Sequence, residues 1–125
     1  MNIPANLKYT KTDEWFDPNT LKAGLTDYAQ SQLSDIVFVE IIVAAGDALQ
    51  VGKQIASVES VKAAAESYAP VSAKVVAVNE SLPDNPELLN SDPYGNGWMI
   101  QVEAGDASAL LDAAAYIKYC EERSH

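Results

Sequence analysis

The chain has 125 residues, of which 48% are hydrophobic and 21% are charged, and its formal net charge is −10 at pH 7. This length suits one domain over residues 1–125, and the balance of apolar and charged residues excludes a disordered or fibrous protein. The acidic charge argues against nucleic-acid partners and anionic membrane surfaces, because both need a basic patch, and it suits a monomer that meets proteins with basic faces.

Cys120 is the single cysteine and His125 the single histidine, which leaves no internal disulfide and too few ligands for a zinc site. A reducing compartment is therefore expected, with Cys120 as a packing residue on a C-terminal helix. There is no apolar run of membrane-spanning length, and the N-terminus lacks the features of a signal or transit peptide. We expect a cytoplasmic location if the protein is bacterial, or the mitochondrial matrix if this is the mature form of a eukaryotic protein.

The first third of the chain predicts a hairpin, a short helix and a buried strand. A strong turn signal at Asp17-Pro18-Asn19-Thr20 separates two strand-like runs, and Thr26 or Asp27 offers a helix cap soon afterwards. The apolar, β-branched run after Asp35 is typical of a buried strand. In chain order we expect strands over residues 9–16 and 21–25, a helix ending near residue 33 and a strand over residues 36–43.

The middle of the chain predicts a hairpin with a lysine at its tip. Valine-rich runs over residues 51–58 and 69–78 are bounded by Gly or Pro, as strands usually are, and a tight turn at Val61 and Lys62 would join them. The turn lacks Gly, Asn and Asp at its central positions, which favours a type I turn over the primed hairpin turns.

Local propensity leaves a surface helix open for the same stretch. Three alanines follow Lys62, and Glu59 and Glu66 would share a helical face with this lysine. An exposed lysine is a hydrated cation with little chemistry of its own at neutral pH. At a hairpin tip its use is therefore as a tether for a covalently attached group.

The last third predicts a loop over residues 79–86, a one-turn helix, a strand and a C-terminal helix. Asn85 and Pro86 fit the N-cap and the first position of the one-turn helix, and Asp112 is a candidate cap for a second, offset helix near the C-terminus. We expect a helix over residues 87–89, a strand over residues 98–103 and a helical segment over residues 106–122. The residues expected to dock the C-terminal helix on a sheet are Leu110, Leu111, Ala114 and Ile117, and the aromatic residues expected in the core are Trp15, Phe38, Tyr94 and Trp98.

The chain resembles the glycine cleavage system H protein family over nearly its whole length. The run Val58-Glu59-Ser60-Val61-Lys62-Ala63-Ala64, followed by Tyr68-Ala69-Pro70-Val71-Ser72, is similar to the lipoyl-attachment segment of that family. Each further motif is weak alone, but their joint order is highly specific. These motifs are Leu7-Lys8-Tyr9-Thr10, Glu14-Trp15, Gly24-Leu25-Thr26-Asp27, Asp35-Ile36-Val37-Phe38-Val39-Glu40, Asn79-Glu80, Pro86-Glu87-Leu88 and Asp92-Pro93-Tyr94-Gly95-Asn96-Gly97-Trp98.

The resemblance implies a mainly β (α+β) barrel-sandwich hybrid of the lipoyl-domain type, with short helices and a C-terminal helix. It also implies that lipoic acid is bound to Lys62 as N6-lipoyllysine, and that the protein is a carrier and not an enzyme. The implied partners are a pyridoxal-phosphate glycine decarboxylase that loads an aminomethyl group, a tetrahydrofolate-dependent aminomethyltransferase that removes the carbon, an FAD-dependent dihydrolipoyl dehydrogenase and a lipoate-attaching enzyme.

Other carriers remain as alternatives. A lipoyl-relay protein would donate the same group to other lipoate-dependent enzymes, and lipoyl domains of 2-oxoacid dehydrogenases carry a similar hairpin on flexible linkers within longer chains. Biotinyl domains flank their lysine with methionines, whereas Val61 and Ala63 flank Lys62 here. Acyl carrier proteins are helical and need a serine in an Asp-Ser-Leu context. An interaction protein that has kept only the fold is the last alternative.

The resemblance places Thr12, Glu14 and Glu66 in the cleft that holds the loaded arm, where carboxylates would shelter its protonated amine. The chain departs from the family pattern at three positions. Asp13 stands where the family usually has His, and is expected to alter this cleft. The other two departures are Ser34 and Ala73, each at a position where Gly is usual.

Overall fold

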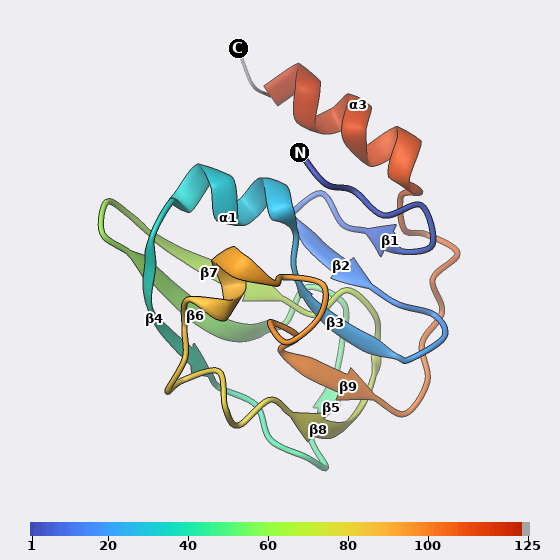
Figure 1. The fold of residues 1–125 in the computed structure, drawn as a ribbon. Coiled ribbons are helices and arrows are strands. Elements are labelled where there is room, and N and C mark those ends of the chain that lie inside the picture. Colours follow the sequence, from blue (N-terminus) through green and yellow to red (C-terminus); the bar gives the residue numbers. More distant parts are fainter. Residues whose placement is uncertain (124–125) are drawn as a thin grey trace.

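The computed structural model describes residues 1–123, which form nine strands and three helices (Figure 1). None of the described helices is long and apolar enough to cross a membrane. His125 lies outside the described residues. The elements are β1 (Lys8–Tyr9), β2 (Glu14–Phe16), β3 (Lys22–Leu25), α1 (Asp27–Leu33), β4 (Ile36–Ile41), β5 (Ala48–Leu49), β6 (Gln54–Ser60), β7 (Ala64–Tyr68), β8 (Ala73–Val78), α2 (Leu88–Ser91), β9 (Ile100–Val102) and α3 (Ala113–Arg123).

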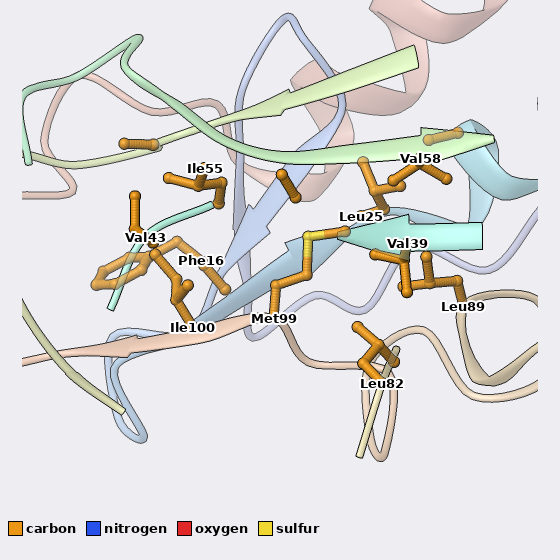
Figure 2. Packing of buried hydrophobic residues seen from close by; sticks show 14 of the residues in the cluster. Phe16, Leu25, Val39, Val43, Ile55, Val58, Leu82, Leu89, Met99 and Ile100 are labelled. Carbon is orange, nitrogen blue, oxygen red and sulfur yellow. The ribbon is translucent and has the colours of Figure 1, made fainter. Parts of the chain in front are cut away.

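The strands form two antiparallel sheets around the main hydrophobic core. The larger sheet has the order β1-β2-β3-β9-β8-β5, and the smaller sheet has the order β4-β6-β7. Side chains from both sheets meet between them: Phe16 and Ile100 come from the larger sheet, and Val39, Ile55 and Val58 from the smaller (Figure 2). The predicted barrel-sandwich hybrid with short helices and a C-terminal helix is confirmed.

A second buried cluster attaches α3 to the larger sheet. Tyr9 of β1 stacks on Tyr116 of α3, with ring centroids 4.8 Å apart and 9° between the ring planes. Cys120 is buried in the same cluster, which confirms its interpretation as a packing residue. Trp15 is buried here too, as predicted, and Tyr28 joins it from α1.

The first predicted strand, over residues 9–16, is instead a tight hairpin. β1 pairs with β2, with Tyr9 opposite Trp15, and residues 10–13 make the turn between them. This turn contains neither Gly nor Pro. Asp13 adopts the left-handed conformation, with φ of 75°, which Asp tolerates better than most residues, and its backbone N–H donates to the carbonyl of Thr10.

The strands around the lysine hairpin also differ from the prediction. The strand expected over residues 69–78 is the shorter β8, which belongs to the larger sheet, and the strand that returns from the lysine is β7, which ends before Pro70, whose missing N–H cannot extend a ladder. β4 ends at Ile41, and its pairing with β6 is irregular between Ile36 and Phe38, which breaks the alternation of inward and outward side chains. Val37 is 57% exposed, and Phe38, predicted in the core, is 45% exposed.

The C-terminal helix begins at Ala113, not at Asp106 as predicted. The prediction that Asp112 caps an offset helix is confirmed, because its carboxylate accepts a backbone N–H of the first turn of α3 at 2.8 Å. The later start also changes the docking face. Tyr116 is buried, whereas Ala114, predicted to dock, is exposed.

Two smaller elements are corrected as well. The helix predicted over residues 87–89 is α2, and Asn85 is not its N-cap, because the Asn85 side chain donates instead to the carbonyl of Ser81. The strand predicted over residues 98–103 is the shorter β9. Trp98 and Tyr94 are half-buried and pack on the edge of the second cluster.

Candidate functional site

Lys62 lies at the exposed tip of the β6–β7 hairpin, so the alternative of a surface helix is wrong. The hydroxyl of Ser60 accepts the backbone N–H of Lys62 at 3.3 Å and that of Ala63 at 3.0 Å. The N–H of Ser60 in turn donates to the carbonyl of Ala63 at 2.8 Å. Neither Val61 nor Lys62 has a positive φ, so the turn is not of a primed type, as predicted.

The hairpin tip is also fixed to the body of the protein. The backbone N–H of Val61 donates to the carbonyl of Asp35 at 3.1 Å, and Asp35 lies between α1 and β4. The neighbours of Lys62 are small or exposed, with Val61 76% exposed and Ala63 and Ala64 exposed. The backbone of the lysine is therefore held in place while the side chain stands in solvent.

Glu14 is buried beneath the turn of residues 10–13. Its Oε1 accepts hydrogen bonds from the hydroxyls of Thr10 at 2.7 Å and Thr12 at 2.5 Å. Its Oε2 accepts the backbone N–H of Tyr68, at the end of β7, at 3.1 Å. The β1–β2 hairpin and the lysine-bearing hairpin thus meet at one carboxylate.

Burial raises the pKa of Glu14 from 4.5 to about 7. The hydrogen bonds from Thr12, Thr10 and Tyr68 lower this pKa and partly oppose the effect of burial, and the negative charge of Asp13 raises it slightly. Glu14 is therefore a carboxyl group that changes its charge near neutral pH.

Two of the predicted docking residues, Thr12 and Glu66, line one pocket of about 210 Å³ beside the lysine hairpin. Glu66 is exposed there and accepts a hydrogen bond from the hydroxyl of Tyr68 at 2.8 Å. Glu14 does not line the pocket but lies behind Thr12, to which it is hydrogen bonded. The remaining wall combines aliphatic and polar groups from β3, α1 and the two hairpins: Asp13, Leu25, Ala29, Gln32, Leu33 and Ala65.

Asp13 lines the same pocket, but its carboxylate is already bound by α3. Arg123, the single arginine of the chain, approaches it with both terminal nitrogens: Nη2 lies 2.5 Å from Oδ1 and Nη1 lies 3.2 Å from Oδ2. The hydroxyl of Tyr116 donates to the same Oδ1 at 2.8 Å. The residue that departs from the family pattern is thus a link between the pocket and the C-terminal helix.

Sequence reasoning missed several members of this site. The hydroxyl cap of Ser60 could have been anticipated from its position two residues before the lysine, because serine hydroxyls often bond nearby backbone N–H groups in turns. Thr10 gave a weaker signal, through its alternation with Thr12. No local signal pointed to Arg123, because its partner Asp13 is 110 residues away.

Comparisons with known proteins agree with this geometry. A family model described as glycine cleavage H-protein matches residues 7–123. The chain is 50% identical over 121 residues to the glycine cleavage system H protein of Psychrobacter cryohalolentis, covering 92% of this chain and 95% of that protein. It is 47% identical over 127 residues to the protein of the same name from Alteromonas mediterranea, covering 97% and 98%.

The fold gives the same result. A crystal structure of a glycine cleavage system H protein from Mycobacterium marinum matches with a TM-score of 0.82 and 30% sequence identity, covering 98% of this chain and 100% of that one. The family match includes every element from β1 to α3, and with them the lysine hairpin and the pocket beside it. The chain therefore belongs to the glycine cleavage H-protein family.

Proposed function

We propose that Lys62 carries lipoic acid as N6-lipoyllysine and that residues 1–125 act as one lipoyl-bearing carrier domain. The role of the family is that of the shuttle protein of the glycine cleavage system. The observation that supports the assignment of the lysine is its place in a rigid turn, exposed to solvent, beside a pocket with an aliphatic wall and carboxylates at its rim. Neither a biotinyl domain nor an acyl carrier protein is compatible with the family match.

The residues around Lys62 fit such an arm. The small side chains of Ala63 and Ala64 leave the amine open to an attaching enzyme, and an amide bond there removes a charge that makes no ion pair among the described residues. When bound, the lipoyl group supplies a dithiolane that accepts and releases the carried aminomethyl group. The hydrogen bonds of Ser60 hold the turn while the arm moves.

The arm has two neighbouring pockets to enter, and we propose that it enters the one lined by Glu66. The other, of about 420 Å³, is lined by Thr10, Thr12, Val51, Gly52, Tyr68 and Ala69, and has no carboxylate on its wall. A chain that is aliphatic along its length and cationic at its end fits a pocket with both kinds of group. Leu25, Leu33 and Ala65 would contact the aliphatic part, and Glu66 the amine.

We propose that Glu14 is the inner anchor for that amine and that Thr12 connects the two. A hydroxyl can donate one hydrogen bond and accept others, so Thr12 can donate to Glu14 while it accepts from an ammonium group in the pocket. A cation at this place favours the ionised form of Glu14, which lowers its pKa from about 7. Docking of the amine would therefore ionise Glu14 and give the cargo a buried counter-ion away from bulk water.

We further propose that the chain catalyses no step itself and meets four partners in turn. These are the glycine decarboxylase, the aminomethyltransferase, the dihydrolipoyl dehydrogenase and a lipoate-attaching enzyme. The net charge of −10 favours basic docking faces on them and a monomeric carrier in solution. Because the similar proteins named above are bacterial, we propose the cytoplasm as the location.

The test loads the lipoylated protein with glycine and glycine decarboxylase, removes the enzyme, and follows the release of formaldehyde from the arm. Thr12→Ala, Glu14→Ala and Glu66→Ala should leave lipoylation intact but shorten the lifetime of the cargo several-fold, because a partly screened pair of about 1 kcal/mol corresponds to about a fivefold change. The effect at Glu66 should shrink with added salt, since this side chain is exposed.

Glu80→Ala is the matched control, because it removes an exposed carboxylate that does not line the pocket. It should keep the lifetime of the parent. If all three pocket variants hold the cargo as long as the parent does, the proposed docking is wrong. If the protein passes its lipoyl group to a lipoate-free enzyme and accepts no cargo from glycine decarboxylase, the relay function replaces the shuttle.

A further inference from the structure

The C-terminal helix α3 is hydrogen bonded to the turn of residues 10–13, which contains Thr12. Arg123 binds Asp13 with two nitrogens, at 2.5 and 3.2 Å, and Tyr116 donates to the same carboxylate at 2.8 Å. The hydroxyl of Tyr119 adds a fourth hydrogen bond, to the carbonyl of Lys11 at 3.0 Å. Three side chains of α3 thus hold the residues on either side of Thr12.

The guanidinium of Arg123 is itself held in place. It lies over two aromatic rings, 4.7 Å from the centroid of Tyr28 on α1 and 4.1 Å from that of Tyr119 on α3. Such stacking suits the flat, delocalised charge of arginine and leaves its edge nitrogens for the carboxylate. The side chains of Arg123 and Asp13 are 29% and 19% exposed, so the pair is partly sheltered from solvent.

The other side of Asp13 belongs to the pocket. Asp13 lies between Thr12 and Glu14, its backbone carbonyl accepts the N–H of Thr26 at 3.0 Å, and its φ of 75° sets the direction in which the chain enters β2. A change in this residue is therefore transmitted directly to Thr12 on one side and to Glu14 on the other.

We propose that Arg123 is a positioning residue of the docking pocket: from α3 it fixes Asp13, and through Asp13 the placement of Thr12 and Glu14. The proposal builds on the docking role given above to those two residues. It also explains how a carboxylate at the wall of an amine-binding pocket avoids competing with Glu14 and Glu66, because Arg123 already neutralises it.

The charge of Arg123 gives the proposal a readout that packing alone would not produce. The ionisable groups around the Asp13 carboxylate and Glu14 are Arg123, Tyr116, Tyr119 and Cys120 from α3, Tyr28 from α1, Tyr68 and Glu66 from β7, and Lys11 from the turn itself, whose ammonium lies 5.7 Å from the Tyr119 ring centroid. Arg123 is the cation that forms an ion pair with the Asp13 carboxylate. Without it the charge of Asp13 is no longer balanced, and because that charge raises the pKa of Glu14, the titration of Glu14 should move upward.

The experiment compares Arg123→Gln with Lys118→Gln, which removes one positive charge from an exposed position of the same helix. Carbon-13 NMR of the unmodified protein follows the titration of the Glu14 carboxyl, and the formaldehyde assay follows the lifetime of the cargo. We expect Arg123→Gln to raise the Glu14 midpoint and to shorten the lifetime several-fold. Lys118→Gln should leave both unchanged. Arg123→Lys keeps the charge but cannot make both hydrogen bonds to Asp13. The lifetime of the cargo in this variant should lie between those in Arg123→Gln and in the parent.

A parent-like midpoint and lifetime in Arg123→Gln would overturn the proposal, as would equal changes in Lys118→Gln. If Arg123→Gln does not fold, Arg123→Lys carries the test, and a parent-like lifetime in that variant overturns it. The NMR titration needs neither lipoate nor cargo. A Glu14→Ala protein with an undiminished lifetime would therefore defeat the docking function while leaving the link between Arg123 and Glu14 to be judged by the midpoint alone.

Discussion

Glu14 is a buried carboxyl group whose hydrogen bonds come from neutral donors, the hydroxyls of Thr10 and Thr12 and the backbone N–H of Tyr68. Its pKa of about 7 has a consequence for stability. Between pH 4.5 and about 7 the unfolded chain releases this proton and the folded protein keeps it, so the free energy of unfolding falls as the pH rises. Above about pH 7 the carboxyl group is ionised in both states, so the contribution of Glu14 to the free energy of unfolding no longer changes with pH.

The first prediction concerns this pH dependence. Between pH 4.5 and pH 7, Glu14 should lower the free energy of unfolding by about 3 kcal/mol. Each pKa unit by which folding raises the pKa corresponds to about 1.4 kcal/mol. In Glu14→Gln this loss should disappear, and urea unfolding at pH 5 and pH 8 measures it. Glu66→Gln, at an exposed carboxylate, should keep the pH dependence of the parent. An equal fall in stability in Glu14→Gln and the parent would show that Glu14 is not the titrating group.

Ser34 is strained where the family usually has glycine. It follows α1 with φ of 66° and ψ of −146°, a conformation that residues with a Cβ rarely adopt. Replacing glycine with serine costs free energy where φ is positive, and at Ser34 it is. At Ala73, the other such position, φ is not positive, so no strain arises there.

The second prediction follows from Ser34. Ser34→Gly should raise the free energy of unfolding by about 1 kcal/mol, because the relief of strain exceeds the entropy that glycine adds to the unfolded chain. The melting temperature should rise by about 4 °C. Ser34→Ala is the matched control and should stay close to the parent, since it keeps the Cβ. A glycine variant no more stable than the alanine variant would contradict the assigned strain.

At the scale of elements, the lysine hairpin was predictable in part and the hairpin before it was not. The run before Lys62, bounded by Gly, indicates the strand β6, but the valine-rich run after it forms β8 of the larger sheet, and the returning strand β7 has the sequence Ala64-Ala65-Glu66-Ser67-Tyr68, which carries no strand pattern of its own. The turn of residues 10–13 contains no Gly or Pro to mark the end of a strand. It is stabilised by the hydroxyls of Thr10 and Thr12 and by a left-handed aspartate, which a single sequence does not distinguish from polar positions along a strand.

The third prediction concerns the turn that presents the lysine. Ser60→Ala removes the acceptor for two backbone N–H groups and should cost about 1 kcal/mol of stability. It should also slow attachment of lipoate at Lys62, because the backbone of the tip is less well fixed. Ser60→Thr keeps the hydroxyl and should modify at the rate of the parent. Equal attachment rates in the alanine and threonine variants would show that the cap has no part in presenting the lysine.

The fourth prediction concerns the inner face of β7. Ser67 is buried, and within residues 1–123 its hydroxyl has no hydrogen-bond partner. Ser67→Ala should therefore raise the free energy of unfolding by about 1 kcal/mol, because an unpaired buried hydroxyl is destabilising. Ser57→Ala, which removes a hydroxyl bonded to Gln54, should bring no such gain. Thermal unfolding decides, and a destabilised Ser67→Ala would mean that the hydroxyl is satisfied in solution.

Across the whole molecule, the sequence predicted the fold and the exposed place of Lys62 at a hairpin tip, because the motifs that carry the resemblance extend from Leu7 to Trp98. It did not predict how the ends of the chain meet. Arg123 and Asp13 are 110 residues apart, and neither position carries a local pattern that names the other. The effect of Asp13 was expected to fall on the docking cleft, and the structure supplies the physical route through Arg123 and Tyr116.

The central claim is that Lys62 is the attachment point of a lipoyl group, and intact-mass spectrometry of protein made with an active lipoate-attaching enzyme tests it most directly. The parent should gain the mass of one lipoyl group, mapped to Lys62, and Lys62→Arg should gain none. The arginine variant should keep its stability within about 0.5 kcal/mol, because the side chain is exposed. A parent without the addition, a different adduct, or a lipoyl group on the Lys62→Arg protein would contradict the account.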